Sequence, residues 1–336
     1  LTLTAITTTG STPNCNTNLS GQAKAIVVDA TSVAGTVSSD VTVCKGTNSG
    51  TLSVAGHNGT VVRWEYLPAG SSTWTVVSNT TTSLTFTNLT KTTKYRVYTR
   101  NNTCSEIVST NEVTVTVNEL PTVTIAIPTA NNPICQYTNG TYTITVGNTY
   151  GQAWAVKVME GASARTLTGT GDGTFTFTSS STFSSNTVIS LQDIATTAGV
   201  TCGPNPQSGD VTFTVTPRPS VTLNSVTTPV CQGTSTFATF SITTSNLASG
   251  VGFDVTYSIG STTGLHYTNT GSGTFTVTTT TPALNTPGSI AVTLTDITTT
   301  GLTPNCNSTP ASQTMNITVD ATSVAGTVSS DVTVCK

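Results

Sequence analysis

Charged side chains are scarce in this chain. They make up 7% of the 336 residues and leave a formal net charge of −3. No basic patch with interleaved aromatic residues is present, so nucleic-acid binding is not expected. No apolar run approaches the roughly 20 residues that a transmembrane helix needs. No segment of ten or more residues has a persuasive 3.6-residue period, so helices are not expected either.

Residues that carry chemistry are also few. The two histidines, His57 and His266, lie in turn-like segments of different parts of the chain, and no C-x-x-C pair suggests zinc. The glycine-rich run at 169–174 is followed by neither Lys nor a helix, so we interpret it as a hairpin turn and not as a phosphate loop. We therefore predict a protein that is not an enzyme, without catalytic residues, metal sites or cofactors.

Alternating polar and apolar residues are found along most of the chain. Examples are TYTITV (141–146), TFTFTS (174–179) and VTFTVT (211–216). A period of two is typical of half-buried strands, here with Thr on the wet face. The regular Val, Ile, Phe and Tyr supply a core that disordered chains lack. The sequence predicts an all-β protein.

The chain repeats itself. Residues 28–45 and 319–336 both read VDATSVAGTVSSDVTVCK, and residues 4–16 resemble 295–307 at the same offset of 291 positions. A long period of this kind indicates a tandem array. We therefore expect a longer mature molecule whose function comes from repetition.

The 291-residue period divides into three similar units of about 97 residues, the size of an immunoglobulin-like sandwich. Each unit has a cysteine-containing opening, a cysteine-containing closing and a last alternating strand. Short junctions between them predict an extended, semi-rigid rod. The predicted divisions are the last strands of a preceding unit at 1–29, three immunoglobulin-like domains at 30–118, 119–217 and 218–319, and the start of a next unit at 320–336.

Two aromatic residues of the first unit have predicted places in a sandwich. Trp64 lies where a core Trp often packs. The run 88–101 resembles the end pattern of fibronectin type III domains, in which Tyr95 is a tyrosine corner.

Eight evenly spread cysteines indicate disulfides and an oxidising, extracellular location. Because the cores are small and poor in aromatics, we expect one stabilising disulfide within each unit. The predicted pairs are Cys44–Cys104, Cys135–Cys202 and Cys231–Cys306. The partners of Cys15 and Cys335 are expected outside the segment.

The second and third units share the pattern P-x-C-Q, a long alternating body, a second cysteine and a final strand such as VTFTVTPRP. This pattern resembles the PKD-like and immunoglobulin-like repeats of giant surface adhesins of Bacteroidota, including the gliding-motility type exported by type IX secretion. The resemblance implies a cell-surface or secreted filament that acts in attachment, with neighbouring repeats, filament subunits or surface polysaccharide as partners.

Two alternatives stay open. Trp74 lies between polar residues and is a candidate for stacking on sugar, which would make the domains a carbohydrate- or partner-binding module. The array is otherwise the stalk of a secreted hydrolase. Asp29, Asp320 and Glu119 are acids at junctions; we interpret them as solvated linker residues, with calcium binding as the weaker alternative.

Overall fold

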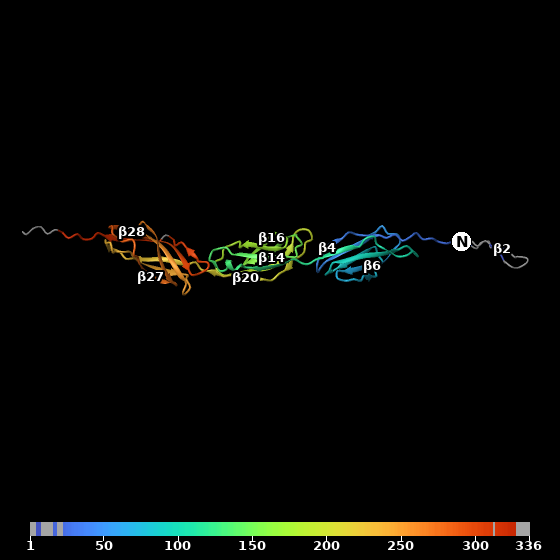
Figure 1. Ribbon diagram of the computed structural model, residues 1–336, viewed down its shortest axis with the longest axis horizontal. Coiled ribbons are helices and arrows are strands. Elements are labelled where there is room, and N and C mark those ends of the chain that lie inside the picture. The colour runs from blue at the N-terminus through green and yellow to red at the C-terminus, as the bar shows by residue number, and fades with distance from the viewer. Residues whose placement is uncertain (1–4, 8–15, 19–22, 312, 327–336) are drawn as a thin grey trace, which may run out of the picture.

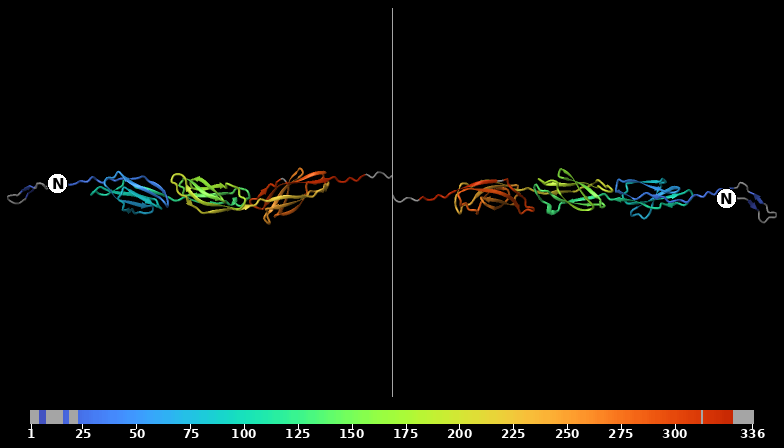
Figure 2. Two further views of the ribbon diagram at one scale, coloured as in Figure 1. Left: turned by 180° about the vertical axis from the view of Figure 1, so that it is seen from behind. Right: turned by 90° about the horizontal axis from the view of Figure 1, so that it is seen from above.

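The computed structural model describes residues 5–7, 16–18, 23–311 and 313–326. Three β-sandwiches follow one another along the long axis of the molecule (Figure 1). The same linear order is seen from behind and from above (Figure 2). The prediction of an all-β tandem rod is confirmed.

The first sandwich packs a three-stranded sheet on a six-stranded one. In the smaller sheet the order is β3-β5-β8; in the larger it is β4-β11-β9-β6-β7, with β10 on β9. The strands are β3 (Thr36–Val37), β4 (Val41–Cys44), β5 (Ser49–Ala55), β6 (Thr60–Pro68), β7 (Thr75–Val77), β8 (Ser83–Thr87), β9 (Thr93–Arg100), β10 (Ile107–Val108) and β11 (Val113–Asn118).

The second sandwich repeats this plan. The sheet β12-β14-β17 faces β16-β15-β18-β19, in which β20 also pairs with β18, and β13 pairs with β21. The elements are β12 (Thr122–Ala126), the 3-10 turn η1 (Thr129–Asn131), β13 (Ile134–Cys135), β14 (Thr141–Gly147), β15 (Ala153–Glu160), β16 (Ser163–Thr170), β17 (Gly173–Thr178), β18 (Thr187–Thr196), β19 (Asn205–Pro206), β20 (Asp210–Phe213) and β21 (Val215–Thr216).

The third sandwich has the sheets β22-β24-β27 and β23-β30-β28-β25-β26, with β29 on β28. Its strands are β22 (Ser220–Val226), β23 (Val230–Cys231), β24 (Thr239–Ser245), β25 (Gly252–Ile259), β26 (Thr262–Thr270), β27 (Gly273–Thr278), β28 (Gly288–Thr300), β29 (Asn307–Ser308) and β30 (Gln313–Asp320). Ahead of the three sandwiches, β1 (Ala5–Thr7) pairs with β2 (Asn16–Asn18).

Each sandwich has its own hydrophobic core. The three cores draw on residues between 37 and 115, between 123 and 213, and between 221 and 319. We propose that the units divide as the sequence predicts, and we use unit one, unit two and unit three for 30–118, 119–217 and 218–319. The described part of the chain contains no helix long and apolar enough to cross a membrane.

Each core contains a large, buried aromatic side chain. Trp154 and Phe253 lie at equivalent positions, opposite Thr196 and Thr299, whereas Trp64 lies opposite Val97, further along its strand. Trp64 of β6, Trp154 of β15 and Phe253 of β25 are fully buried. Both indole N–H groups donate to a backbone carbonyl 17 residues later, Trp64 to Thr81 at 3.0 Å and Trp154 to Gly171 at 2.9 Å. The core position predicted for Trp64 is confirmed, and the bonded N–H explains why burial of the indole is tolerated.

Tyr95 also lies in the core, but not as a tyrosine corner. Burial raises the pKa of its hydroxyl to about 12. Among the described residues that hydroxyl has no hydrogen-bond partner, whereas a tyrosine corner needs one on the backbone. The ring contributes packing instead, against Phe86 and Tyr66.

Threonine covers the outer faces of the sheets, as the alternation predicts. Directly opposite threonines join their hydroxyls across strands at 2.9 Å in Thr145–Thr174 and Thr243–Thr274. Such pairs stabilise neighbouring strands without adding apolar surface. The outer surface is therefore polar with few charges.

Candidate functional sites: the junctions between units

The fold places the two cysteines of one unit at opposite ends of that unit. In unit one, Cys44 ends β4, which pairs in parallel with β11 and lies opposite Asn118, where the chain leaves the unit. Cys104 follows β9, which runs antiparallel to β11 and ends at the other end. With about 3.3 Å per residue, the two cysteines are on the order of 30 Å apart.

The predicted pairs within units, Cys44–Cys104, Cys135–Cys202 and Cys231–Cys306, are therefore wrong. A disulfide needs Cα atoms less than about 7 Å apart, which opposite ends of a sandwich cannot provide. The observed disulfides join successive units instead. Cys44 pairs with Cys202 and Cys135 pairs with Cys306, with Cα–Cα distances of 5.5 and 5.6 Å.

Four cysteines remain. Cys104 and Cys231 are the free cysteines of the described part of the chain, partly exposed and exposed respectively. The prediction for Cys15 and Cys335 falls on residues outside the described ranges.

Cys202 and Cys306, the second cysteines of units two and three, are held by hydrogen bonds within their own units. The Cys202 N–H donates to Thr196 Oγ1 at 2.7 Å, and the Thr196 N–H donates back to the Cys202 carbonyl at 2.9 Å. Cys306 and Thr299 make the same pair of bonds at 2.7 and 2.8 Å. A Thr near the end of β18 or β28 thus fixes the loop that carries Cys202 or Cys306. This loop lies at the entry end of its unit, the end at which the chain enters; the opposite end, at which the chain leaves, is the exit end.

The junction between units one and two has polar contacts beside its disulfide. Lys45, next to Cys44, pairs with both oxygens of Glu119 at 3.0 Å. The linker also receives a hydrogen bond from Asn205, whose side chain donates to the Pro121 carbonyl at 2.8 Å. Glu119 is thus a paired linker residue. A groove of about 530 Å³ lies beside these contacts, lined in part by Lys45, Leu120 and Pro204.

One arginine bridges the junction between units two and three. Arg218 Nε donates to the Gln136 carbonyl of unit two at 2.8 Å, and Arg218 Nη1 donates to the Asn307 carbonyl of unit three at 3.0 Å. A mostly apolar groove of about 490 Å³ flanks this junction, between Pro217 on one side and Leu247 on the other. The disulfide and the arginine together fix both sides of the linker.

At the entry end of unit one Cys104 is a free cysteine, and its loop is held by other hydrogen bonds than the loops of Cys202 and Cys306. The Cys104 N–H donates to the Asn101 carbonyl at 2.9 Å, and Thr99 Oγ1 donates to the Val33 carbonyl at 3.1 Å. The loop 101–105 lies on the incoming linker, where Asp29 accepts hydrogen bonds from the Asn102 amide and the Thr103 hydroxyl, both at 2.9 Å. Hydrogen bonds from Asn102 and then Thr103 lower the pKa of the Asp29 carboxyl. The Cys104 thiol donates to the Ala30 carbonyl at 3.3 Å.

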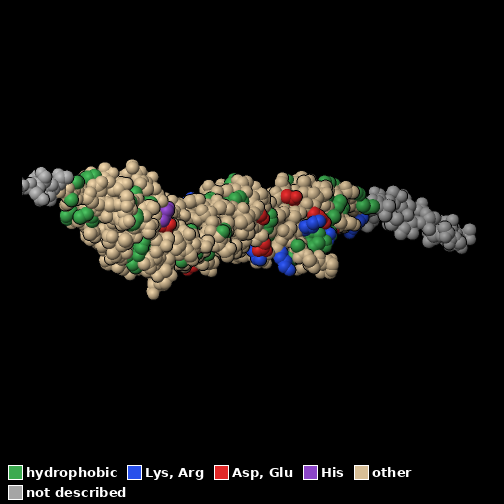
Figure 3. Space-filling model, turned by 60° about the vertical axis from the view of Figure 1, so that its left-hand side comes forward, with side chains coloured by type: hydrophobic (Ala, Val, Ile, Leu, Met, Phe, Trp, Pro, Cys, Tyr) green, Lys and Arg blue, Asp and Glu red, His purple; other side chains and the backbone are tan. Residues whose placement is uncertain are grey.

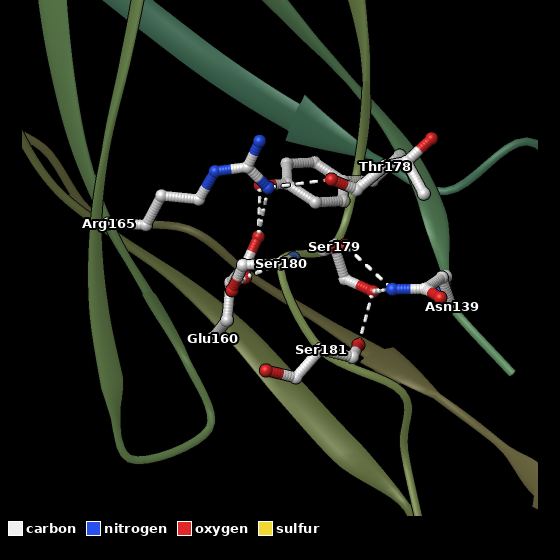
Figure 4. A network of polar contacts seen from close by, with 9 residues as sticks. Asn139, Glu160, Arg165, Thr178, Ser179, Ser180 and Ser181 are labelled. Carbon is white, nitrogen blue, oxygen red and sulfur yellow. Dashed lines mark hydrogen bonds and ion pairs between the residues drawn. The ribbon is translucent and has the colours of Figure 1, made fainter. Parts of the chain in front are cut away.

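Inside unit two, a buried carboxylate organises the end of a sheet (Figure 4). Glu160 accepts from Arg165 Nη1 at 2.7 Å, from the Tyr142 hydroxyl at 2.8 Å, and from the backbone N–H and hydroxyl of Ser180. Burial, which raises the pKa of Glu160, is outweighed by these hydrogen bonds, those of Ser180 foremost, and the pKa is lowered. The same burial raises the pKa of Tyr142.

This network extends to the loop after β17. Arg165 Nη1 also donates to the Thr178 carbonyl at 2.6 Å, and the Asn139 amide donates to the Ser179 carbonyl at 2.8 Å (Figure 4). The two oxygens of the Glu160 carboxylate accept four hydrogen bonds, all of them from the protein itself. We interpret the network as structural, because it leaves no free group for a substrate.

Charged side chains gather on unit one (Figure 3). Glu65 is the buried centre, paired with Arg63 Nε at 2.9 Å and Arg96 Nη2 at 2.7 Å. Burial raises the pKa of Glu65, but hydrogen bonds from Arg63 and Arg96 outweigh it and lower the pKa. The Arg96 guanidinium also lies 4.1 Å above the ring of Trp74. One face of that ring is therefore occupied by the protein.

The two histidines, considered as catalytic or metal-binding residues, lie in different units. His266 pairs with Asp254 at 3.0 Å on the surface of unit three, whereas His57 belongs to unit one. Within the described ranges, no group of three or more His, Cys, Asp and Glu side chains is positioned to hold a metal ion.

Comparisons with known proteins describe the chain only in outline. A family model described as a domain of unknown function (DUF8696) matches residues 33–119. No curated protein matches. The similar solved structures include a 1.5-MDa bacterial ice-binding adhesin, with a TM-score of 0.36 and 15% identity over 88% of this chain and 100% of that one.

Two further solved structures are similar. The I9–I11 tandem from titin has a TM-score of 0.32 and 13% identity, over 85% of this chain and 100% of that one. A tetra-tandem repeat in the extending region of a large adhesion protein has a TM-score of 0.26 and 14% identity, over 85% and 75%. Scores this low carry no argument about function.

Proposed function

We propose that the chain is a structural segment of an extracellular adhesin or filament, a stalk whose units are linked to one another by disulfides. The observation that supports this proposal is the position of both disulfides across junctions of an end-to-end array. A bond placed there adds nothing to a binding surface within a unit. It fixes the direction and spacing of neighbouring units, which is what a load-bearing stalk requires.

The disulfides also limit how far the chain can extend under load. The shortest covalent route along the three units follows the backbone from Ala30 to Cys44, crosses to Cys202, returns to Cys135, crosses to Cys306 and ends at Asp320. This route contains roughly 95 residues, against roughly 290 along the backbone, so full extension falls from about 1,000 Å to about 300 Å. A pulled stalk would stop lengthening early.

The proposal includes the cellular location of this stalk and the class of adhesin to which it belongs. Disulfides form and persist in oxidising surroundings, which supports an extracellular, cell-surface location. A structural role without enzymatic activity is part of the same proposal. We further propose a gliding-motility adhesin of Bacteroidota, exported by type IX secretion and attached at the outer membrane. Neighbouring repeats would be its structural partners and surface polysaccharide its target.

The test lengthens the stalk in the gene that encodes it. A second copy of residues 29–319 inserted after Val319 preserves the repeat, because Val319–Asp320 matches Val28–Asp29. We expect filaments on the cell surface to lengthen by the three added units, seen by electron microscopy, and attachment under shear to persist.

The matched control keeps the length and removes the links. A strain carrying Cys44→Ser and Cys135→Ser should display filaments of unchanged length that detach at lower shear. Filaments of unchanged length after duplication, or a Cys44→Ser, Cys135→Ser strain that stays attached at the same shear as the parent, would show that the array is not the stalk.

A further inference from the structure

We infer that the free cysteines Cys231 and Cys104 are the two halves of one further junction. In it, the exit end of unit three binds a unit with the sequence of unit one, and Cys231 forms a disulfide with the Cys104 of that unit. The inference rests on the geometry of the junctions and does not depend on what the stalk attaches to.

The exit end of unit three has the geometry of the two exits that carry disulfides. Cys231 is the last residue of β23 and lies opposite Asp320, the last residue of β30. Cys44 and Cys135 have the same position, opposite Asn118 and Thr216 respectively, in the same kind of parallel pair. Both of those cysteines are bonded to the closing cysteine of the following unit.

The linker beyond unit three has the sequence that receives unit one. Residues 320–324 read DATSV, as do residues 29–33. At the start of unit one this segment binds the loop of Cys104 through several groups. Besides the two bonds to Asp29, the Asn101 side chain donates to the Ala30 carbonyl at 2.7 Å and the Ser32 hydroxyl donates to the Ser105 carbonyl at 2.7 Å.

Asp320 belongs to both halves of the proposed junction. As the counterpart of Asp29, it would accept from the Asn102 and Thr103 of the incoming unit. The thiol of Cys104 lies 3.3 Å from the carbonyl of Ala30, the residue after Asp29. Cys231 lies directly across the β-ladder from Asp320. The loop that binds at Asp320 therefore brings the thiol of Cys104 to Cys231.

The bond itself is an ordinary thiol oxidation. Each Sγ–H loses its proton, the two sulfurs join, and the two electrons pass to a small-molecule disulfide, which is reduced to two thiols. Binding of the loop to the linker keeps the two thiols side by side. Their effective concentration rises, which favours this bond over pairing with a free thiol.

The test uses the full chain with residues 29–319 duplicated as above. Cys104→Ser in the first copy and Cys231→Ser in the second leave one candidate pair, and Cys15→Ser and Cys335→Ser remove the remaining single cysteines. After oxidation with oxidised glutathione, non-reducing peptide mapping should show the first copy's Cys231 linked to the second copy's Cys104 within one chain.

Three results would overturn the inference. They are two free thiols, a Cys104 bonded to any cysteine other than Cys231, and disulfide-linked dimers formed through Cys231. The first could also follow from misfolding, so Cys44–Cys202 and Cys135–Cys306 are mapped in both copies of the same sample as a measure of correct folding.

A second variant tests the binding of the loop. At the seam of the duplicated chain, Asp29 of the second copy takes the place of Asp320. Asp29→Ala in the second copy removes the acceptor, so the equilibrium constant for Cys231–Cys104 oxidation should fall about five-fold, the effect of about one net hydrogen bond. Asp210→Ala, on the exposed face of β20, is the matched control and should leave it unchanged. Equal constants for both variants would show that the linker does not position the loop.

Discussion

The interior of unit two contains no disulfide, whereas both of its ends are disulfide-linked to a neighbour. The interior is held by a core around Trp154 and by the satisfied carboxylate of Glu160. The ends have short linkers, polar contacts and grooves. The difference shows that the disulfides do not compensate for a small core within a unit. They connect units that each have a core of their own.

This placement makes neighbouring units depend on one another. If unit one unfolds while unit two stays folded, Cys202 and the linker still hold both ends of residues 44–119 together. In the chain-entropy model, closing a loop of this length stabilises unit one by about 4 kcal/mol. If unit two is also unfolded, most of that stabilisation is lost, so adjacent units should unfold cooperatively.

The largest expected effect is in the interior. Trp154→Ala should destabilise unit two by about 3–5 kcal/mol, because it leaves a cavity between the sheets. Denaturant unfolding followed by hydrogen exchange of unit two measures the loss. Trp74→Ala, which removes a partly exposed ring stacked on Arg96, should cost about 1 kcal/mol or less in unit one. Equal losses for the two variants would contradict the description of the cores.

Breaking a junction should have the next largest effect. Cys202→Ser should destabilise unit one, a unit that does not contain the change, by about 4 kcal/mol. Tryptophan fluorescence of unit one, from Trp64 and Trp74 in a Trp154→Phe background, reports it. An unchanged midpoint for unit one would show that the link does not couple the units.

A smaller effect is expected from the buried carboxylate. Glu160→Gln keeps the shape but weakens the bonds from Arg165 and Ser180, which should cost unit two about 2 kcal/mol. The matched control is Glu119→Gln at the exposed Lys45 pair, where about 0.5 kcal/mol is expected. Urea midpoints compare the two variants, and a larger loss at Glu119 would reverse the account.

The stability of unit two should depend on pH in the acid range because of Glu160. The pKa of Glu160 in the folded unit lies below its ordinary value of 4.5, so its contribution is present above that pH and is lost as the pH falls through the lowered folded value. The urea midpoint of unit two should therefore drop below pH 4.5 in the parent chain, and less so in Glu160→Gln. Parallel pH profiles would contradict this assignment.

Much of the fold is predictable from the sequence. The alternation of Thr with Val, Ile and Phe predicts the strands, and VVRWEYL predicts both a strand and the core position of Trp64. These features depend on local periodicity, which can be read directly from the sequence. The buried acids Glu65 and Glu160 gave no such signal, because their arginine partners are brought to them by strand pairing.

The disulfide pattern was not predicted because it depends on topology. One opening and one closing cysteine per unit suggested a pair within the unit. The parallel pairing of β4 with β11 and the antiparallel course of β9 separate Cys44 from Cys104. Strand order could have given that signal: in a sandwich of this type the first edge strand and the loop after the penultimate strand point to opposite ends.

The central claim is that covalent links cross the junctions, and cutting one linker tests it most directly. A protease site inserted between Glu119 and Leu120 allows the backbone between units one and two to be cleaved. We predict that the two fragments migrate together on a non-reducing denaturing gel, separate when reductant is added, and separate without reductant in the Cys202→Ser variant. Separation of the parent fragments without reductant would contradict the account, because it is the result that disulfides confined within units would give.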